Sequence, residues 1–209
     1  MHLTRTQAIR ELPIQRKGTK YIARALSHVR EGIPVVIAIR DILKLAHTSR
    51  EVKKMINQGL IKINGRVVKD LKESIRLFNI LEADKSYKLK ILPTRRFYFE
   101  ETNDKSRLCK VIKKTLLNMN RTQLNLHDGT NVLLSEKKEV KIGDSIELDL
   151  NNKIKKIISL EKGRDVFIIS GKSVGLTGKI ENINKKIGKI KIDGVNREVE
   201  LNIAHIMVK

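Results

Sequence analysis

Residues 48–69, TSREVKKMINQGLIKINGRVVK, constrain the fold of this chain more than any other stretch. Thr48 and Glu51 have the spacing of a capping box, in which each side chain bonds to a backbone amide at a helix N-terminus. Gly59 is placed to end the same helix, because glycine enters the left-handed region without a steric penalty. The Asn64-Gly65 pair then predicts a tight hairpin between two short strands. A capped helix therefore leads directly into a hairpin.

This helix has one apolar face and one basic face. Val52, Met55 and Ile56 recur at helical spacing and predict the buried face. The solvent face carries side chains spaced by three, four and seven residues, namely Arg50, Lys53, Lys54 and Asn57. The hairpin adds Lys62 and Arg66. Cations fixed on a small rigid surface suit contacts with nucleic-acid phosphates; a solvated charged face is the alternative.

Positive charge extends along the whole chain. Lysine and arginine outnumber aspartate and glutamate by 44 to 23, which gives a formal net charge of +21 over 209 residues. Each of the segments 1–40, 41–90, 91–160 and 161–209 is itself net positive. We therefore expect a polyanion to be contacted along the length of the protein. A membrane surface fits less well, because no apolar run approaches the ~20 residues of a spanning helix and the sequence predicts no signal peptide.

The scarcity of aromatic residues narrows the choice of polyanion. They make up only 3% of the chain, and tryptophan is absent. Proteins that read single-stranded RNA stack bases on several aromatic side chains, so the composition favours folded RNA held by shape and charge. One cluster, RRFYF at 95–99, mixes cations with aromatics. It fits either RNA contact through Arg95 and Arg96 or a strand edge anchored in the core.

The sequence predicts an α+β protein that begins with a basic arm. Residues 1–33 are weakly periodic, and we expect an arm that is loosely ordered alone and fixed by a partner, with a helix over 21–29. An ordinary N-terminal helix packed on the body is the alternative. Residues 34–93 predict a small domain of two helices and a hairpin. A strand over 87–92 closes it, and Pro93 ends that strand because proline donates nothing to a ladder.

The C-terminal half predicts two β modules. Residues 94–160 contain short strand-like runs separated by turn signals, which are typical of a compact β domain. Residues 161–209 continue as short strands about ten residues apart, as in a small barrel. Their glycine-rich turn at 171–179 carries Lys172 and Lys179, and its exposed backbone suits close approach to RNA. A plain hairpin turn is the alternative.

No constellation for catalysis, metal binding or cofactor binding is present in the sequence. The five histidines are scattered, with no cysteine or carboxylate at ligand spacing. The turn at 171–179 lacks the G-x-x-x-x-G-K-S/T order of a P-loop. The run His127-Asp128-Gly129 predicts a turn, and no nucleophile motif accompanies it. Cys109 is the single cysteine, which excludes an intrachain disulfide and fits a reducing cytosol. We expect no enzyme activity, cofactor, metal or small-molecule substrate.

Two segments carry a family resemblance. Residues 40–83, chiefly SREVKKMINQGLIKINGRVV, resemble the helix-helix-hairpin RNA-binding domain shared by primary-binding small-subunit ribosomal proteins, pseudouridine synthases and tyrosyl-tRNA synthetases. The stretch RDVFIISGKSVGLTGKIENI at 164–183 resembles a KOW motif. With HLTR and IPVVIAIRDILKLA before them, and HDGTNV and KIGDSIELDL between them, the order is similar to that of the archaeal and eukaryotic ribosomal protein S4e family. The lack of a longer leader and a long basic tail favours an archaeal or reduced version.

The resemblance implies a structural constituent of the small ribosomal subunit in the cytoplasm. Such a protein binds ribosomal RNA and contacts neighbouring small-subunit proteins, and it is not expected to bind a membrane. It also implies that residues 161–209 form an SH3-like KOW barrel. An accessory part of an RNA-modifying enzyme and a KOW-type transcription elongation factor are the alternatives. The predicted RNA-binding residues lie in the arm, in the helical region with its hairpin, in the basic-aromatic cluster and in the glycine-rich turn. They are Arg5, Arg10, Arg16, Lys17, Lys20, Lys44, Arg50, Lys53, Lys54, Asn57, Lys62, Arg66, Arg95, Arg96, Lys172 and Lys179.

Overall fold

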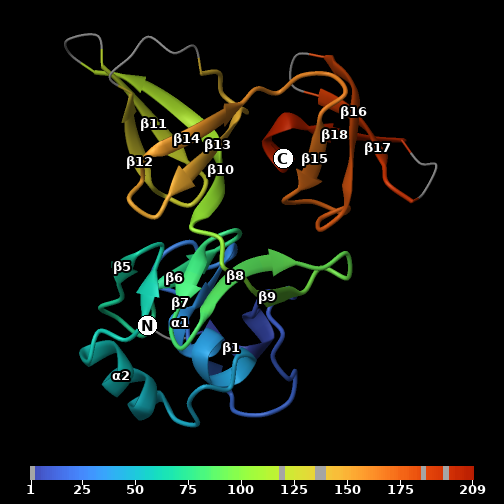
Figure 1. Cartoon of the computed structure of the whole chain (residues 1–209). Helices are drawn as coiled ribbons and strands as arrows, with labels where there is room; N and C mark the ends of the chain where they lie inside the picture. The colour runs from blue at the N-terminus through green and yellow to red at the C-terminus, as the bar shows by residue number, and fades with distance from the viewer. Residues whose placement is uncertain (1–2, 118–120, 135–139, 185–186, 195–197) are drawn as a thin grey trace. The chain divides into compact units, whose positions relative to one another are not determined.

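The chain forms two compact units, residues 1–104 and 105–209 (Figure 1). The computed structural model describes residues 3–117, 121–134, 140–184, 187–194 and 198–209. The described helices are α1 (Val35–Ile37), the π-helical turn η2 (Ala38–Ile42), α2 (Ser49–Asn57) and the 3-10 turns η1 (Arg5–Gln7) and η3 (Ile203–His205). The predicted mixture of helix and sheet is therefore present, but strands dominate it.

A five-stranded antiparallel sheet, in the order β5-β4-β7-β8-β9, is the base of the first unit. The strands of this unit are β1 (Leu3–Thr4), β2 (Tyr21–Ile22), β3 (Gly32–Pro34), β4 (Lys62–Ile63), β5 (Arg66–Val67), β6 (Ser74–Arg76), β7 (Ile80–Glu82), β8 (Ser86–Ile91) and β9 (Phe97–Glu101). Ile37 and Ile39 from the helical segment and Leu81 and Leu89 from the sheet are fully buried. This apolar core fixes α2 and the neighbouring hairpin on one body.

The helix predicted over 21–29 is wrong. Tyr21 and Ile22 instead form β2, which pairs antiparallel with β1. A strand uses its backbone amides in pairing with a neighbour, so the same residues cannot start a helix. Further along, His28 adopts a positive φ of 49°, which also excludes a continuous helix.

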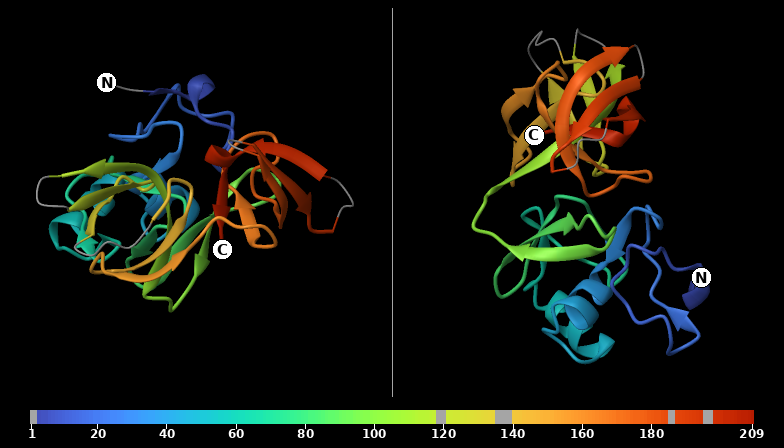
Figure 2. Two further views of the ribbon diagram at one scale, coloured as in Figure 1. Left: turned by 90° about the horizontal axis from the view of Figure 1, so that it is seen from above. Right: turned by 90° about the vertical axis from the view of Figure 1, so that its right-hand side faces the viewer.

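The arm packs on the body of the first unit. The Phe97 amide, on the outer edge of β9, donates to the Glu11 carbonyl at 2.9 Å, and the Leu26 amide donates to the Lys72 carbonyl at 2.8 Å. Leu12 is buried. Figure 2 shows the arm, in dark blue, passing beside the helical segment α1–η2. The expectation of a loosely ordered arm is thus corrected, because long-range hydrogen bonds and an apolar anchor hold it.

The RRFYF cluster forms part of the edge of the first sheet. β9 pairs along its length with β8, from Phe97 opposite Ile91 to Glu101 opposite Tyr87. Phe97 is buried, whereas Arg95 and Arg96 lie exposed in the turn that precedes it. The structure keeps residues 94–104 with the first unit, although the sequence pattern placed a boundary after residue 93.

The second unit contains two five-stranded antiparallel sheets, ordered β12-β11-β10-β13-β14 and β18-β17-β16-β15-β19. Their strands are β10 (Ser106–Leu116), β11 (Thr122–Leu126), β12 (Asn131–Leu134), β13 (Ser145–Asp149), β14 (Ile154–Ile158), β15 (Asp165–Ile168), β16 (Thr177–Asn184), β17 (Ile187–Ile192), β18 (Glu198–Asn202) and β19 (Ile206–Val208). Each sheet has its own core, with Leu124 and Ile146 in the first and Val166 and Ile190 in the second. This unit is therefore built from two sheets, each with an apolar core of its own.

Candidate nucleic-acid interface

Helix α2 begins and ends where its sequence predicts. The hydroxyl of Thr48 accepts the Glu51 amide at 3.2 Å, and the Glu51 carboxylate accepts the Thr48 amide at 3.4 Å and the His47 amide at 2.7 Å. These bonds lower the pKa of Glu51, and the bond from the His47 amide contributes most. Gly59 follows the helix with a φ of +70°. Both ends of the helix are thereby fixed.

The basic face of α2 is free to meet a ligand. Val52 and Ile56 are buried and Met55 is half-buried, so the apolar stripe faces the body as predicted. The opposite face exposes Arg50, Lys53, Lys54 and Asn57. The side chains of these four residues make no hydrogen bond or ion pair with any other residue that the structure describes. They extend the charge of a rigid helix into solvent.

The hairpin after α2 contributes less free charge than its sequence suggests. Asn64 and Gly65 both have positive φ, 52° and 80°, as a tight two-residue turn requires. Arg66 is exposed but forms an ion pair with Glu73 at 2.6 Å. Lys62 is half-buried within β4. A phosphate would compete with Glu73 for Arg66.

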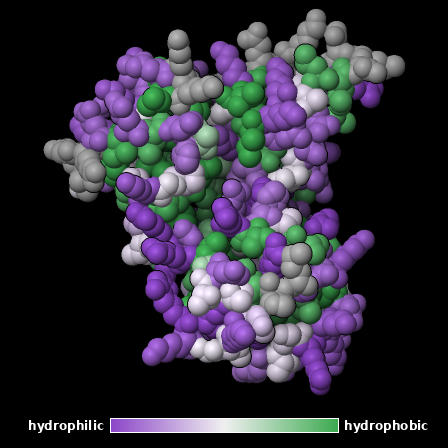
Figure 3. Space-filling model, turned by 180° about the vertical axis from the view of Figure 1, so that it is seen from behind, coloured by the Kyte–Doolittle hydropathy of each residue, from purple (hydrophilic) through white to green (hydrophobic). Residues whose placement is uncertain are grey.

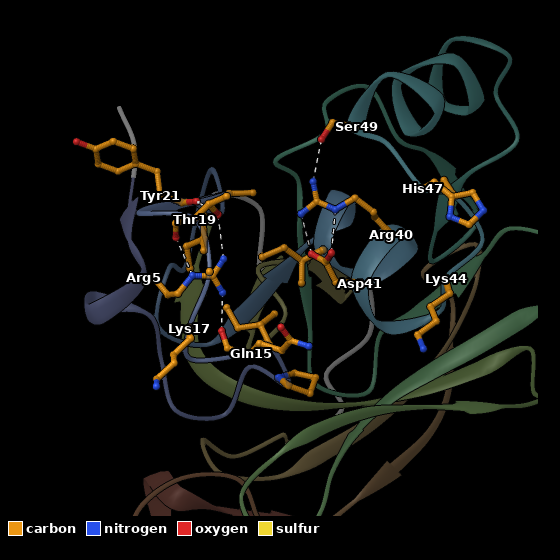
Figure 4. Close-up of a pocket in the computed structure, with 17 residues that line it drawn as sticks. Arg5, Gln15, Lys17, Thr19, Tyr21, Arg40, Asp41, Lys44, His47 and Ser49 are labelled. Carbon is orange, nitrogen blue, oxygen red and sulfur yellow. Dashed lines mark hydrogen bonds and ion pairs between the residues drawn. The ribbon is translucent and has the colours of Figure 1, made fainter.

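A cleft of about 790 Å³ separates the arm from the helical segment of the first unit (Figure 4). Arg5 and Lys17 line it from the arm, and Arg40, Lys44 and His47 line it from the body. Pro13, Ile14, Ile22, Ile37 and Ala46 form its apolar lining. The sequence predicts Arg5, Lys17 and Lys44 as RNA-binding residues but gives no signal for Arg40 and His47, because only the docking of the arm brings the two sides of the cleft together.

The arginines of this cleft serve the fold, and its lysines remain available. The Arg5 guanidinium donates to the Gln15 carbonyl at 2.5 Å and to the Thr19 carbonyl and hydroxyl at 2.8 and 2.9 Å. Arg40 binds Asp41 through two bonds of 2.8 Å and the Ser49 hydroxyl at 3.0 Å. Figure 4 shows both arginines turned toward these partners. The lysines at 17 and 44 are exposed, and their side chains make no hydrogen bond or ion pair with another described residue.

Three of the remaining predicted arm and turn residues lie around a second hollow. Arg10, Arg16 and Arg96 line a smaller hollow of the first unit. Arg95 lies in the same turn as Arg96 and has a φ of 63°. Lys20 lies outside the hollow, with its ammonium 5.4 Å from the Tyr21 ring centroid. Residues far apart in sequence thus share one hollow.

In the glycine-rich turn of the second unit, one glycine is exposed and another is buried in strand packing. Gly171 is exposed beside exposed Lys172. Gly178, however, is buried, and a Cβ at that position would lie 2.3 Å from the Lys191 carbonyl oxygen. Gly178 is therefore required for strand packing and does not expose backbone to RNA, contrary to expectation. Lys179 is exposed, opposite Lys191 on β17.

The second unit also buries two cations for which the sequence gives no signal. The Arg107 side chain is 1% exposed, and its Nε lies 3.1 Å from the Asp128 carboxylate, which is fully buried. Burial opposes ionisation of Asp128, but bonds from the Thr130 amide and the charge of Arg107 outweigh it, so the pKa of Asp128 is lowered. Asp128 lies in the predicted turn, whose role includes holding a buried guanidinium.

Lys110 is the second buried cation. Its Nζ donates to the Ile203 carbonyl at 2.5 Å and to the Ala204 carbonyl at 2.8 Å, which joins β10 of one sheet to η3 beside the other. Burial lowers the pKa of Lys110 to about 8. The Val208 amide also donates to the Ser145 hydroxyl at 3.0 Å. The two sheets are therefore tied together by polar contacts.

The visible surface is largely hydrophilic. Figure 3 shows hydrophilic side chains spread over the face of each unit, with hydrophobic patches between them. Among the described residues, no helix is long and apolar enough to cross a membrane. Within the same ranges, no group of three or more histidine, cysteine, aspartate or glutamate residues is arranged to hold a metal ion.

Comparisons with known proteins place these features in context. Residues 91–155 match the sequence model of a family described as ribosomal family S4e, and residues 41–79 match the S4 domain. The small ribosomal subunit protein eS4 of Methanocella arvoryzae is 33% identical over 190 residues, covering 87% of this chain and 80% of that protein. The protein of the same name from Ignicoccus hospitalis is 34% identical over 227 residues, covering 97% and 88%. A crystal structure of the 30S ribosomal protein S4e from Thermoplasma acidophilum matches with a TM-score of 0.71 and 25% identity, covering 85% of this chain and 94% of that one.

Proposed function

This chain belongs to the ribosomal family S4e and is a structural constituent of the small ribosomal subunit. From that premise we propose that it binds ribosomal RNA through the basic surfaces described above, the face of α2 first among them. The observation that carries the proposal is the face of α2. Arg50, Lys53 and Lys54 are exposed there, without a described partner, on a helix that is capped at its start. Rigid cations of this kind bind phosphates without first breaking internal contacts.

The interface supports the folding of RNA by neutralising phosphates. RNA helices that pack together during assembly bring their backbones close, and cations between them remove the repulsion. If about 6–10 phosphates are engaged, affinity falls by roughly 10³–10⁵ between 50 and 200 mM salt. A flat salt response would contradict this electrostatic reading. Lys17 and Lys44 in the cleft, and Lys172 and Lys179 in the second unit, are the further contacts of the same kind.

Each part of the chain after the arm has its own role in this function. Residues 34–93 act as the helix-helix-hairpin RNA-binding domain, and residues 161–209 act as an SH3-like KOW barrel. Support for the barrel comes from its five antiparallel strands, β15 to β19, around one apolar core. Residues 94–160 provide the central β domain. The protein acts without a cofactor, in the cytoplasm, beside neighbouring small-subunit proteins.

A paired substitution tests the α2 face. The double variant Lys53→Gln/Lys54→Gln removes two positive charges. Because two phosphate contacts are lost, we expect its affinity for small-subunit ribosomal RNA to fall about tenfold or more. The slope of log affinity against log salt should also fall by about one for each lost contact. Filter binding at several salt concentrations measures both quantities. Lys153→Gln/Lys156→Gln is the matched control, because both lysines are exposed and lie outside every predicted contact.

The outcome separates specific from general charge effects. The control is expected to change affinity less than threefold. Equal losses in the two variants would show that only total charge matters and would contradict the α2 assignment. Sedimentation of the protein with free RNA polymerase, and its absence from small subunits in a sucrose gradient, would contradict the wider proposal.

A further inference from the structure

We propose that a hollow on the first unit, the arginine hollow, binds a backbone phosphate of folded RNA; the proposal deepens the RNA-binding function and rests on it. The hollow has a volume of about 340 Å³, and Arg5, Arg10, Arg16 and Arg96 line it. Arg10 and Arg16 come from the arm, whereas Arg96 comes from the turn between β8 and β9, 80 residues after Arg16. Only the folded first unit creates this site.

Charge in the arginine hollow is unbalanced. No aspartate or glutamate is among the described residues that line it. Arg5 donates to Gln15 and Thr19, but the guanidinium groups at 10, 16 and 96 make no hydrogen bond or ion pair with another described residue. Three unpaired guanidinium groups around one hollow repel each other until an anion enters. The hollow therefore attracts an anion more strongly than a single exposed arginine does.

The shape of the group favours a phosphodiester. A guanidinium presents its N–H donors as a planar fork that fits two oxygens of a phosphate, and a phosphodiester offers two non-bridging oxygens. Ile9, Leu12 and Ile14 line the same hollow. Apolar walls lower the local dielectric and strengthen charge-assisted hydrogen bonds. Arginine rather than lysine at every cationic position is consistent with this geometry.

The hollow is positioned by contacts on both of its sides. The Phe97 amide donates to the Glu11 carbonyl, and these residues directly follow Arg96 and Arg10 in sequence. Within the turn, the Leu92 amide donates to the Arg96 carbonyl at 2.9 Å. The two arginines are thus held near each other before RNA arrives. A preformed site loses little conformational entropy on binding.

The variant Arg96→Gln tests the site. We expect its affinity for small-subunit ribosomal RNA to fall roughly tenfold, and the slope of log affinity against log salt to fall by about one, as for one lost phosphate contact. Arg30→Gln is the matched control, because Arg30 is exposed in the same unit, lines neither cavity and loses the same charge. Equal effects of the two substitutions would overturn the proposal.

A double-mutant cycle tests whether two segments share one phosphate. If Arg10 and Arg96 hold the same group, Arg10→Gln/Arg96→Gln loses less affinity than the product of the single losses. A strictly multiplicative loss would assign the two arginines to independent contacts and overturn the shared site. Thermal unfolding of each variant, expected to be unchanged because the side chains are exposed, confirms that the arm remains folded.

Inorganic phosphate separates the two sources of the anion. We expect the chemical shifts of the arginine Nε–Hε NMR signals of the full chain to change when ribosomal RNA is added at micromolar concentrations. Inorganic phosphate should change them only at millimolar concentrations. Chloride keeps the ionic strength equal in the two titrations. A response to inorganic phosphate at the RNA concentrations would make a free ion the ligand and overturn the RNA assignment. If wild-type protein does not bind RNA, the proposed function fails. If the wild-type protein binds RNA but substitutions in the hollow leave its affinity unchanged, only the proposal for the hollow is contradicted.

Discussion

In the first unit the cations of α2 are exposed and have no described partner, whereas in the second unit Arg107 and Lys110 are almost completely buried. The first group can exchange water for phosphate at little cost. The second group has already exchanged water for a carboxylate or for backbone carbonyls, and removing those partners leaves a buried charge. A net charge of +21 is therefore not a measure of the surface offered to RNA. Part of it holds the β sheets of the second unit together.

Of the substitutions that test this difference, Asp128→Asn should have the largest effect on stability. It leaves Arg107 buried without its carboxylate, and we expect the free energy of unfolding of the second unit to fall by about 3–5 kcal/mol. The loss should disappear in strong acid, because the lowered pKa of Asp128 stabilises the fold above the ordinary value of 3.8, and that stabilisation is lost as pH falls through the folded-state pKa. Hydrogen exchange of the β10 amides measures the change.

The matched control for this substitution lies on the surface of the first unit. Glu101→Gln breaks the ion pair of Lys85 and Glu101, whose side chains are 60% and 62% exposed. Because water screens an exposed pair, we expect the free energy of unfolding to change far less than in Asp128→Asn. Similar losses for the buried pair and the exposed pair would contradict the distinction between the two units.

Lys110→Met tests the second buried cation through pH. In the wild-type protein the folded state loses the Lys110 proton near pH 8, but the unfolded state keeps it until about 10.5. Between these values the unfolded state binds more protons, so wild-type stability should rise with pH relative to the variant, by up to about 3 kcal/mol. Urea unfolding across pH 7–11 measures this difference. Parallel curves for the two proteins would show that folding does not lower the pKa of Lys110.

The smallest expected effect concerns the support of the exposed cations. Thr48→Ala removes the hydroxyl that accepts the Glu51 amide, and we expect about 1 kcal/mol of local stability to be lost from α2. Hydrogen exchange of the α2 amides measures it. Thr48→Ser keeps the hydroxyl and should keep most of the stability. An equal loss in both variants would show that the cap does not support this helix.

Sequence predicted well those features that depend on neighbouring residues. The capping box at Thr48, the helix end at Gly59 and the Asn64-Gly65 hairpin are all confirmed, because each is decided by backbone chemistry within a few positions. The helix over 21–29 failed for the opposite reason. There, pairing of β2 with β1 overrides weak local preference.

Long-range contacts limited what could be predicted about the candidate site. Arg10, Arg16 and Arg96 each carried a recognisable charge, but their meeting depends on the bond between Phe97 and Glu11. Arg107 gave no signal either, since nothing in its neighbourhood separates a buried arginine from a surface one. Its partner Asp128 was identified only as part of a turn. A partner 21 residues away decides the difference.

The bond from the Phe97 amide to the Glu11 carbonyl also bears on the protein before it reaches its subunit. β9 is the outermost strand of its sheet, and an uncovered strand edge is a template on which another chain can pair and aggregate. By occupying an outward amide of β9, the arm shortens that template. A newly made copy without RNA is thereby less prone to join a second copy edge to edge, which keeps it available for assembly.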